Sequence, residues 1–189
     1  PNTLLSGNYV EFNKTFKFKN VVSVDTVGNL LFVLDQGLNS AFKFDIAGLV
    51  TNDPALKRTG IDDSDHPGRY LLKTIGGTQY TEIKNRLVDP VSVSIHDEKI
   101  YILDNGTHSI KVYDLNFNYL TEAKNGAMYN QQTRDIPVSV VVDQISDTDK
   151  TPRGYILSST GKVYEYDPRT NTISQPWRLF ESYLPFEIY

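Results

Sequence analysis

Short runs of alternating hydrophobic and polar residues recur along the chain. Residues 91–95 alternate valine or isoleucine with serine, and residues 109–112 alternate serine or lysine with isoleucine or valine. A period of two predicts β-strands with two unlike faces. Residues 100–103 are apolar throughout, which is typical of a strand covered on both faces. No segment carries the apolar spacing of a capped amphipathic helix, so we expect an all-β fold.

The predicted strands belong to a repeated unit. Residues 21–45 align with residues 90–114 without a gap, and a weaker third copy spans residues 137–167. Internal repetition of this kind is the signature of a repeat architecture. We predict three units, at residues 20–77, 88–123 and 136–176, preceded by a partial unit at residues 7–19.

Each unit is predicted to be a four-stranded antiparallel meander, because turn residues separate the apolar runs. Asn105 and Gly106 tolerate positive φ and favour a tight hairpin. In the first unit, the alternation at residues 41–43 is out of phase with the equivalent stretch of the second unit, which predicts a bulge or a slipped register. The polar insertions at residues 47–69 and 123–134 are expected to be surface loops.

An aspartate and a glycine recur after the second predicted strand. Asp35 and Gly37 in the first unit match Asp104 and Gly106 in the second, whereas Ser158 replaces the aspartate in the third. A carboxylate at this position can accept hydrogen bonds from backbone N–H groups of the following turn. We therefore assign the two aspartates and the two glycines a structural role in the turn.

The second unit resembles an NHL repeat. The resemblance rests on residues 74–77, 87–93, 100–106 and 109–114. These segments give a Gly-rich spacer, a proline before a small apolar strand, an aromatic-aliphatic strand ending in Asp, a small-residue turn and a third strand ending in Asp. NHL repeats form the blades of β-propellers, so the resemblance implies a radial arrangement of the units.

Three units are fewer than the four to eight blades of a typical propeller. We therefore expect residues 1–189 to form a single β-propeller-type domain or a fragment of one. The chain begins at Pro1 rather than Met, and we expect it to be a portion of a longer polypeptide.

Composition narrows the classes of function. A net charge of −4 at pH 7 argues against a dedicated nucleic-acid-binding protein, which needs a basic surface to neutralise phosphates. The absence of cysteine excludes disulfides, thiolate metal sites and cysteine nucleophiles. No apolar run approaches the ~20 residues that span a membrane. The 12 tyrosines and 9 phenylalanines agree with a sheet-rich fold.

No catalytic motif is present. The chain lacks a Gly-x-Ser-x-Gly sequence, and no Ser, His and Asp set is suggested by order or spacing. Gly76 and Gly77 lack the Lys and Ser or Thr of a phosphate-binding loop and are interpreted as a turn. We therefore expect neither an enzyme nor a bound cofactor.

Metal sites are also not expected. The three histidines do not converge in the predicted unit, whereas a zinc site needs three or four convergent ligands. The acidic loop at Asp62, Asp63 and Asp65 is the weak candidate for calcium. Its spacing does not match an EF-hand, and the following Pro67 and Gly68 explain the segment as a turn.

Aromatic residues recur at every third position near the end of the chain, among them Trp177, Phe180 and Tyr183. Pro176 and Pro185 limit any helix there to about two turns. The segment either packs on a neighbouring blade, which we favour, or forms an interaction tail, for which these three aromatic residues are weak candidates.

These observations favour a non-catalytic structural or protein-interaction module of a larger protein or assembly. Its partners would be other protein chains or domains of the same assembly. The cysteine-free, tyrosine-rich composition resembles virion proteins such as those of phage tails and baseplates. The sequence does not assign a localisation. Its composition favours the virion or the extracellular space.

Two alternatives stay open. The first is an NHL-like propeller enzyme, a lyase or a lactonase, with a metal in its channel, although the equivalent inner-strand positions Val22, Val91 and Val138 are apolar. The second is a cell-surface propeller that binds carbohydrate or peptide. Loop tyrosines at positions 70, 80 and 129 would then stack on the ligand.

Overall fold

The computed structural model describes residues 18–46, 71–77, 82–124, 135–146, 148–174 and 177–178. In this part of the chain the strands form three antiparallel sheets. Sheet one contains β1 (Val21–Val27), β2 (Leu30–Asp35), β3 (Ser40–Asp45) and β4 (Leu71–Gly76). Sheet two contains β5 (Pro90–His96), β6 (Lys99–Asp104), β7 (Ser109–Asp114) and β8 (Tyr119–Lys124). Sheet three contains β9 (Pro137–Gln144), β10 (Pro152–Ser158), β11 (Lys162–Asp167), β12 (Thr172–Ile173) and β13 (Trp177–Arg178).

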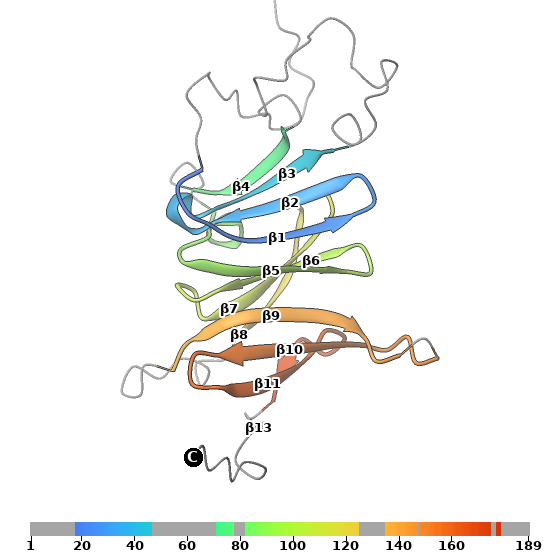
Figure 1. Ribbon diagram of the computed structural model, residues 1–189. Helices are drawn as coiled ribbons and strands as arrows, with labels where there is room; N and C mark the ends of the chain where they lie inside the picture. Colours follow the sequence, from blue (N-terminus) through green and yellow to red (C-terminus); the bar gives the residue numbers. More distant parts are fainter. Residues whose placement is uncertain are drawn as a thin grey trace, which may run out of the picture.

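Each sheet is a meander in which hydrogen-bonded neighbours follow one another in the chain. Figure 1 shows the sheets stacked face to face in chain order, with β1, β5 and β9 lying one above another. The predicted all-β class and the four-stranded antiparallel units are therefore confirmed. Among the described residues no helix is long and apolar enough to cross a membrane.

Of the bulge or slipped register predicted at residues 41–43, the slip against β2 is absent, and a bulge-like shift occurs at Lys43 and Phe44 in the pairing of β3 with β4. Leu34 lies opposite Ala41 in sheet one, and Leu103 lies opposite Ile110 at the equivalent place in sheet two. Both sheets then show a one-residue shift between the third and fourth strands, at Lys43 in β3 and at Val112 in β7. The out-of-phase alternation is tolerated because β3 is buried almost throughout, so neither of its faces must be polar.

The fourth strand of sheet three is divided into two pieces. Tyr166 of β11 pairs with Ile173 of β12, and Val163 of β11 pairs with Trp177 of β13. The register along β11 changes by one residue between these pairs, as it does in the other two sheets. β12 and β13 therefore together take the place of a fourth strand beside β11.

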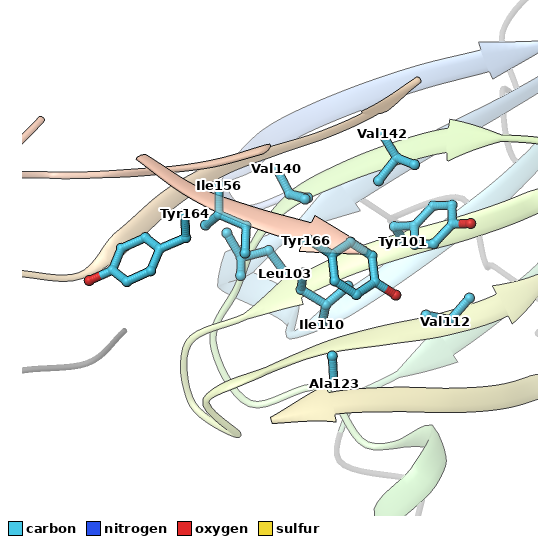
Figure 2. Close-up of a cluster of buried hydrophobic side chains, with 10 residues drawn as sticks. All are labelled: Tyr101, Leu103, Ile110, Val112, Ala123, Val140, Val142, Ile156, Tyr164 and Tyr166. Atoms are coloured by element: carbon cyan, nitrogen blue, oxygen red, sulfur yellow. The ribbon is translucent and has the colours of Figure 1, made fainter. Parts of the chain in front are cut away.

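Two layers of apolar side chains hold the stack together. The layer between sheets one and two contains Phe32, Leu34, Ala41, Ile75, Leu87, Val93, Ile100, Ile102, Tyr113 and Phe117. The layer between sheets two and three, drawn in Figure 2, contains Tyr101, Leu103, Ile110, Val112, Ala123, Val140, Val142, Ile156, Tyr164 and Tyr166. Large, fully buried side chains contribute most of the hydrophobic stabilisation.

Part of the outer side of sheet one is also covered. Val33, Phe42, Phe44 and Leu71 form a third buried cluster there. The ring of Phe18 meets the ring of Phe42 edge to face, with 5.4 Å between the ring centroids. This side of sheet one is therefore covered over β3 and β4, whereas along β1 it is open, with Val24 58% exposed.

The side chain of Phe117 is packed between sheets one and two. It lies in the turn between β7 and β8 and is 3% exposed. Its ring packs edge to face on Phe32, with centroids 5.6 Å apart, and on Tyr113, with centroids 6.3 Å apart. Its φ of 57° is in the left-handed region, which a bulky residue rarely adopts. The Asp114 carboxylate fixes this turn by accepting N–H bonds of 2.8 Å from Asn116 and Asn118.

The third strand of sheet two has no solvent-facing side. Ser109 and Lys111 form the polar one of its two unlike faces, yet both are fully buried. Sheet two lies between the other two sheets, so both faces of β7 are covered. Lys111 is accommodated because its Nζ donates a 2.7 Å hydrogen bond to the carbonyl oxygen of Arg86.

Candidate protein-interaction face

The Asp104 carboxylate ties the turn after β6 to the segment that leads into β5. It is fully buried and accepts hydrogen bonds from the backbone N–H groups of Val88, Asp89 and Gly106, the shortest at 2.8 Å. A β-carbon on Gly106 would lie 2.5 Å from Cβ of Val88, so the close approach requires glycine. The repeated Asp and Gly thus position backbone and carry no reactive arrangement.

Asp35 makes the equivalent set of bonds in sheet one. Its carboxylate accepts from the backbone N–H groups of Lys19, Asn20 and Leu38, at 2.7 to 3.0 Å. A β-carbon on Gly37 would lie 2.7 Å from Cβ of Lys19. The same local chemistry therefore closes the first two sheets.

In sheet three the carboxylate and its hydrogen-bond donors have exchanged places. Its carboxylate belongs to Asp135, in the segment that leads into β9, and its donors are Thr160 on the turn after β10 and Lys162 at the start of β11. Burial tends to raise the pKa of Asp135, but hydrogen bonds from Lys162, Ser158 and Thr160 outweigh it and hold that pKa below its usual range. Ser158, at the position of Asp104, accepts the N–H of Lys162 at 3.2 Å.

Serine hydroxyls connect successive sheets along the innermost strands. Ser23 Oγ of β1 accepts a 3.1 Å hydrogen bond from the N–H of Val93 in β5. Ser92 Oγ of β5 accepts a bond of the same length from the N–H of Val140 in β9. The two interfaces therefore share one polar anchor in addition to their apolar layers.

The outer face of sheet three, on the side away from sheet two, is the candidate site. Val141, Tyr155 and Leu157 are 53%, 43% and 44% exposed. Tyr155 lies opposite Val141 in the pairing of β10 with β9, and alternation along β10 places Leu157 on the same face. Arg153 and Glu165 form an ion pair beside them. A flat apolar patch with a polar edge is typical of a surface that another polypeptide covers.

Large apolar residues at the equivalent positions of the other sheets are buried. Tyr101 and Leu103 of β6 match Tyr155 and Leu157 of β10, and they are 1% exposed because sheet three covers them. The sheet-three face thus has the composition of a buried inter-sheet layer but is open to solvent among the described residues. Figure 2 shows the covered equivalents, Tyr101 and Leu103, against strands of sheet three.

A shallow polar cleft of about 290 Å³ lies between sheets one and two. Lys73, at its wall, donates a hydrogen bond to the carbonyl oxygen of Asn116, and Lys84 pairs with Glu82 at 3.4 Å. The cations of the cleft are therefore already partnered, and we assign it no function.

The remaining sequence candidates do not converge. His96 ends β5, with Nδ1 3.5 Å from Oδ1 of Asp143, whereas His108 lies in the turn before β7. Within the described ranges no group of three or more His, Asp or Glu side chains could hold a metal ion. Trp177 has its backbone in β13, opposite Val163.

Several predictions concern residues beyond the described part of the chain. These are the acidic loop at Asp62, Asp63 and Asp65, the aromatic residues Phe180 and Tyr183, most of the partial unit at 7–19, and the tyrosines at 70, 80 and 129.

Sequence reasoning missed the inter-sheet serines and the open face. The Val-Ser-Val signal is visible at residues 22–24, 91–93 and 138–140, but it shows only that the serine recurs. Its partner lies on another sheet and depends on how the sheets stack. The match of Tyr155 with Tyr101 was the available signal for the open face.

No model of a known protein family matches the chain, and no curated protein matches it in sequence. The fold is similar to that of several solved structures. Hydrazine synthase of Kuenenia stuttgartiensis matches with a TM-score of 0.53 and 12% identity, over 89% of this chain and 39% of that one. A structure of U3-55K matches with a TM-score of 0.55 and 10% identity, over 84% and 39%. The WD40 repeats of RRP9 match with a TM-score of 0.53 and 10% identity, over 84% and 38%.

At these identities the similarity concerns the fold alone. The three sheets are blade-like sheets of a partial β-propeller, similar to WD40 blades. The chain spans about two fifths of the length of the matched structures. The more specific resemblance to NHL repeats stays a prediction.

Proposed function

We propose that this chain is a non-catalytic structural module of a larger protein or assembly, joined to further polypeptide through the outer face of sheet three. The observation that carries the proposal is the exposure of Val141, Tyr155 and Leu157 together on one sheet face. Contiguous apolar surface of this kind is costly to leave in water and marks interaction sites. Propeller folds commonly mediate protein interactions, which supports the same class of function.

The arrangement of the described residues favours a scaffold over the propeller-enzyme alternative. Val22, Val91 and Val138, at equivalent places on the innermost strands, offer no metal ligand. The buried aspartates 35, 104 and 135 are each occupied by backbone or side-chain donors. The inter-sheet serines and apolar layers instead fix the relative positions of the sheets, as a rigid scaffold requires.

Within this class we favour a component of a large assembly, such as a phage tail or baseplate, in the virion or outside the cell. The support is compositional: no cysteine and 12 tyrosines in 189 residues. The carbohydrate- or peptide-binding alternative relies on tyrosines beyond the described residues, and no structural observation favours it.

The proposal is tested by placing a charge on the face. Leu157→Asp, in the protein expressed from its complete reading frame, should weaken the contact because the aspartate would be buried without a partner. Leu120→Asp is the matched control, since Leu120 is 48% exposed on β8, away from this face. We expect Leu157→Asp to lower the thermal midpoint by about 5 °C or more relative to the control.

Circular dichroism of the 189-residue chain carrying either substitution checks that the sheets still form. Equal thermal midpoints for the two variants of the complete protein, with unchanged size by light scattering, would show that this face joins nothing.

A further inference from the structure

The two inter-sheet interfaces are anchored by the same atoms. Ser23 Oγ accepts from the N–H of Val93 and also lies 3.5 Å from the carbonyl oxygen of Val93. Ser92 Oγ accepts from the N–H of Val140 and lies 3.3 Å from the carbonyl oxygen of Val140. Each hydroxyl therefore engages both backbone groups of one residue on the first strand of the next sheet.

Ser139 is the third member of this series. Ser23, Ser92 and Ser139 are each the third residue of the first strand of their sheet. Ser139 is exposed, and within the described residues its hydroxyl has no hydrogen-bond partner. The anchor that joins sheet one to two, and two to three, is thus present once more on sheet three, without its counterpart.

The apolar part of the interface is repeated as well. Tyr101 and Leu103 are buried by sheet three, and their matches Tyr155 and Leu157 are exposed on the face that bears Ser139. The outer face of sheet three therefore carries both the serine and the apolar residues. The same combination on sheets one and two contacts the sheet that follows.

We propose that a fourth four-stranded antiparallel sheet, formed by the same polypeptide, packs on this face and places a backbone N–H of its first strand on Ser139 Oγ. The proposal rests on the proposed function and names the partner. In both existing interfaces, the face that bears the serine receives the sheet that follows in chain order. Continuity with these interfaces identifies the occupant.

A second copy of the chain is a poorer occupant. To continue the stack it would have to offer the outer side of its sheet one. Phe42, Phe44 and Leu71, on the β3 and β4 part of that side, are 1%, 8% and 6% exposed. A copy could therefore reach only the part along β1, where Val24 is 58% exposed, unless it displaced what covers the rest. A fourth sheet in the same polypeptide needs no such displacement.

The new interface has one polar anchor where the existing ones have two. Asp25 Oδ2 accepts the N–H of Ile95 at 2.7 Å, and Ser94 Oγ accepts the N–H of Val142 at 3.0 Å. The equivalent residue on β9 is Val141, whose side chain cannot accept a hydrogen bond. The fourth sheet should therefore meet β9 through Ser139 and make an apolar contact at Val141.

Cysteine labelling tests the proposal directly, because the chain has no cysteine and each engineered one is unique. Leu157→Cys reports on the face, and Leu120→Cys on β8 is the matched exposed control. Maleimide reaction rates are measured in the 189-residue chain and in the protein expressed from its complete reading frame. We expect Cys at 157 to react at least ~10-fold more slowly in the complete protein, while the control changes little.

Substitution of the anchor adds a second measurement. Ser139→Ala should raise the labelling rate at position 157 several-fold in the complete protein and leave the thermal midpoint of the 189-residue chain unchanged. Ser92→Ala is the matched comparison, and it should lower the midpoint of both forms, because its partner Val140 is present in both.

Fast labelling at position 157 in the complete protein would overturn the proposal. So would protection already present in the 189-residue chain and lost on dilution, since a second copy would then cover the face. In that case Leu157→Asp would still weaken the contact, and the proposed function would stand. If Leu157→Asp behaves like Leu120→Asp, the proposed function fails as well.

Discussion

Asp135 and Lys162 form an ion pair that does for sheet three what a lone aspartate does for the other sheets. Asp135 Oδ2 lies 2.5 Å from Lys162 Nζ, and Asp135 is 1% exposed. In sheet two, Asp104 sits on the turn and accepts from the segment that leads into the sheet. In sheet three the carboxylate sits on that segment, and the donors sit on the turn and at the start of β11.

Asp135→Asn should destabilise the protein by about 3 kcal/mol or somewhat less, because Lys162 loses its counterion but still reaches solvent. Urea unfolding at pH 7 measures the change in free energy. Asp97→Asn is the control, since Asp97 lies exposed in the turn after β5 and tolerates its positive φ as asparagine. A cost at position 135 no larger than at position 97 would contradict the assignment.

The same pair predicts a pH dependence. The pKa of Asp135 is lowered in the fold, so the unfolded chain takes up the proton first as the pH falls. Its contribution is present above about pH 5 and is lost as the pH falls through the lowered value. The difference in unfolding free energy between wild type and Asp135→Asn should therefore shrink between pH 5 and pH 3, on an order-of-magnitude scale.

Asp104→Asn should cost on the order of 3 kcal/mol, because an amide in place of the carboxylate leaves buried N–H groups facing a second donor. The equivalent change, Asp35→Asn, should cost a similar amount, since Asp35 makes the same kind of bonds. Equilibrium unfolding in urea compares the two. A large cost at one position and none at the other would show that the two turns are not equivalent.

Phe117→Ala should cost about 3 kcal/mol or more through the cavity it leaves between sheets one and two. Phe117→Gly removes the same ring but relieves the φ of 57°. We therefore expect the glycine variant to be no less stable than the alanine variant, the reverse of the usual order at a strand position. Thermal unfolding compares the two variants. A glycine variant clearly less stable than the alanine variant would contradict backbone strain at position 117.

Lys111→Met should alter stability at alkaline pH. Burial lowers the pKa of Lys111, although Asp104 and Glu122 oppose this. Above that lowered pKa the unfolded chain binds more protons than the fold, so stability rises with pH toward the ordinary lysine value of about 10.4. This rise, measured as the pH approaches that value from below, should be smaller in Lys111→Met. A rise of the same size in Lys111→Met and in the wild type would contradict the prediction.

The sequence predicted the strands and the repeated turn because both depend on local patterns. The positions of Asp104 and Gly106 relative to Asp35 and Gly37 suffice to place the turn. The exchange at Asp135 was not predictable in this way, because alignment on the second strand of the unit shows only that Ser158 has replaced an aspartate. The compensating carboxylate lies earlier in the chain and is brought close only by folding.

Residues that act between sheets were the hardest to predict. Lys111 belongs to the polar face of its strand, and only the stacking of three sheets shows that it is buried. Ser92 was visible as a repeated residue, yet its partner Val140 is determined by the distance and register between two sheets. The pattern of residues along one strand does not show which other sheet packs against it.

In the described part of the chain, every sheet is built from one uninterrupted stretch of sequence, and none borrows a strand from a distant segment. Each sheet is therefore a structural unit that corresponds to one segment of the gene. A tandem duplication of the second unit would keep the interfaces with sheet one and sheet three and add one new interface, between the two copies. There, the Ser92 face of one copy would have to fit the Val93 face of the other.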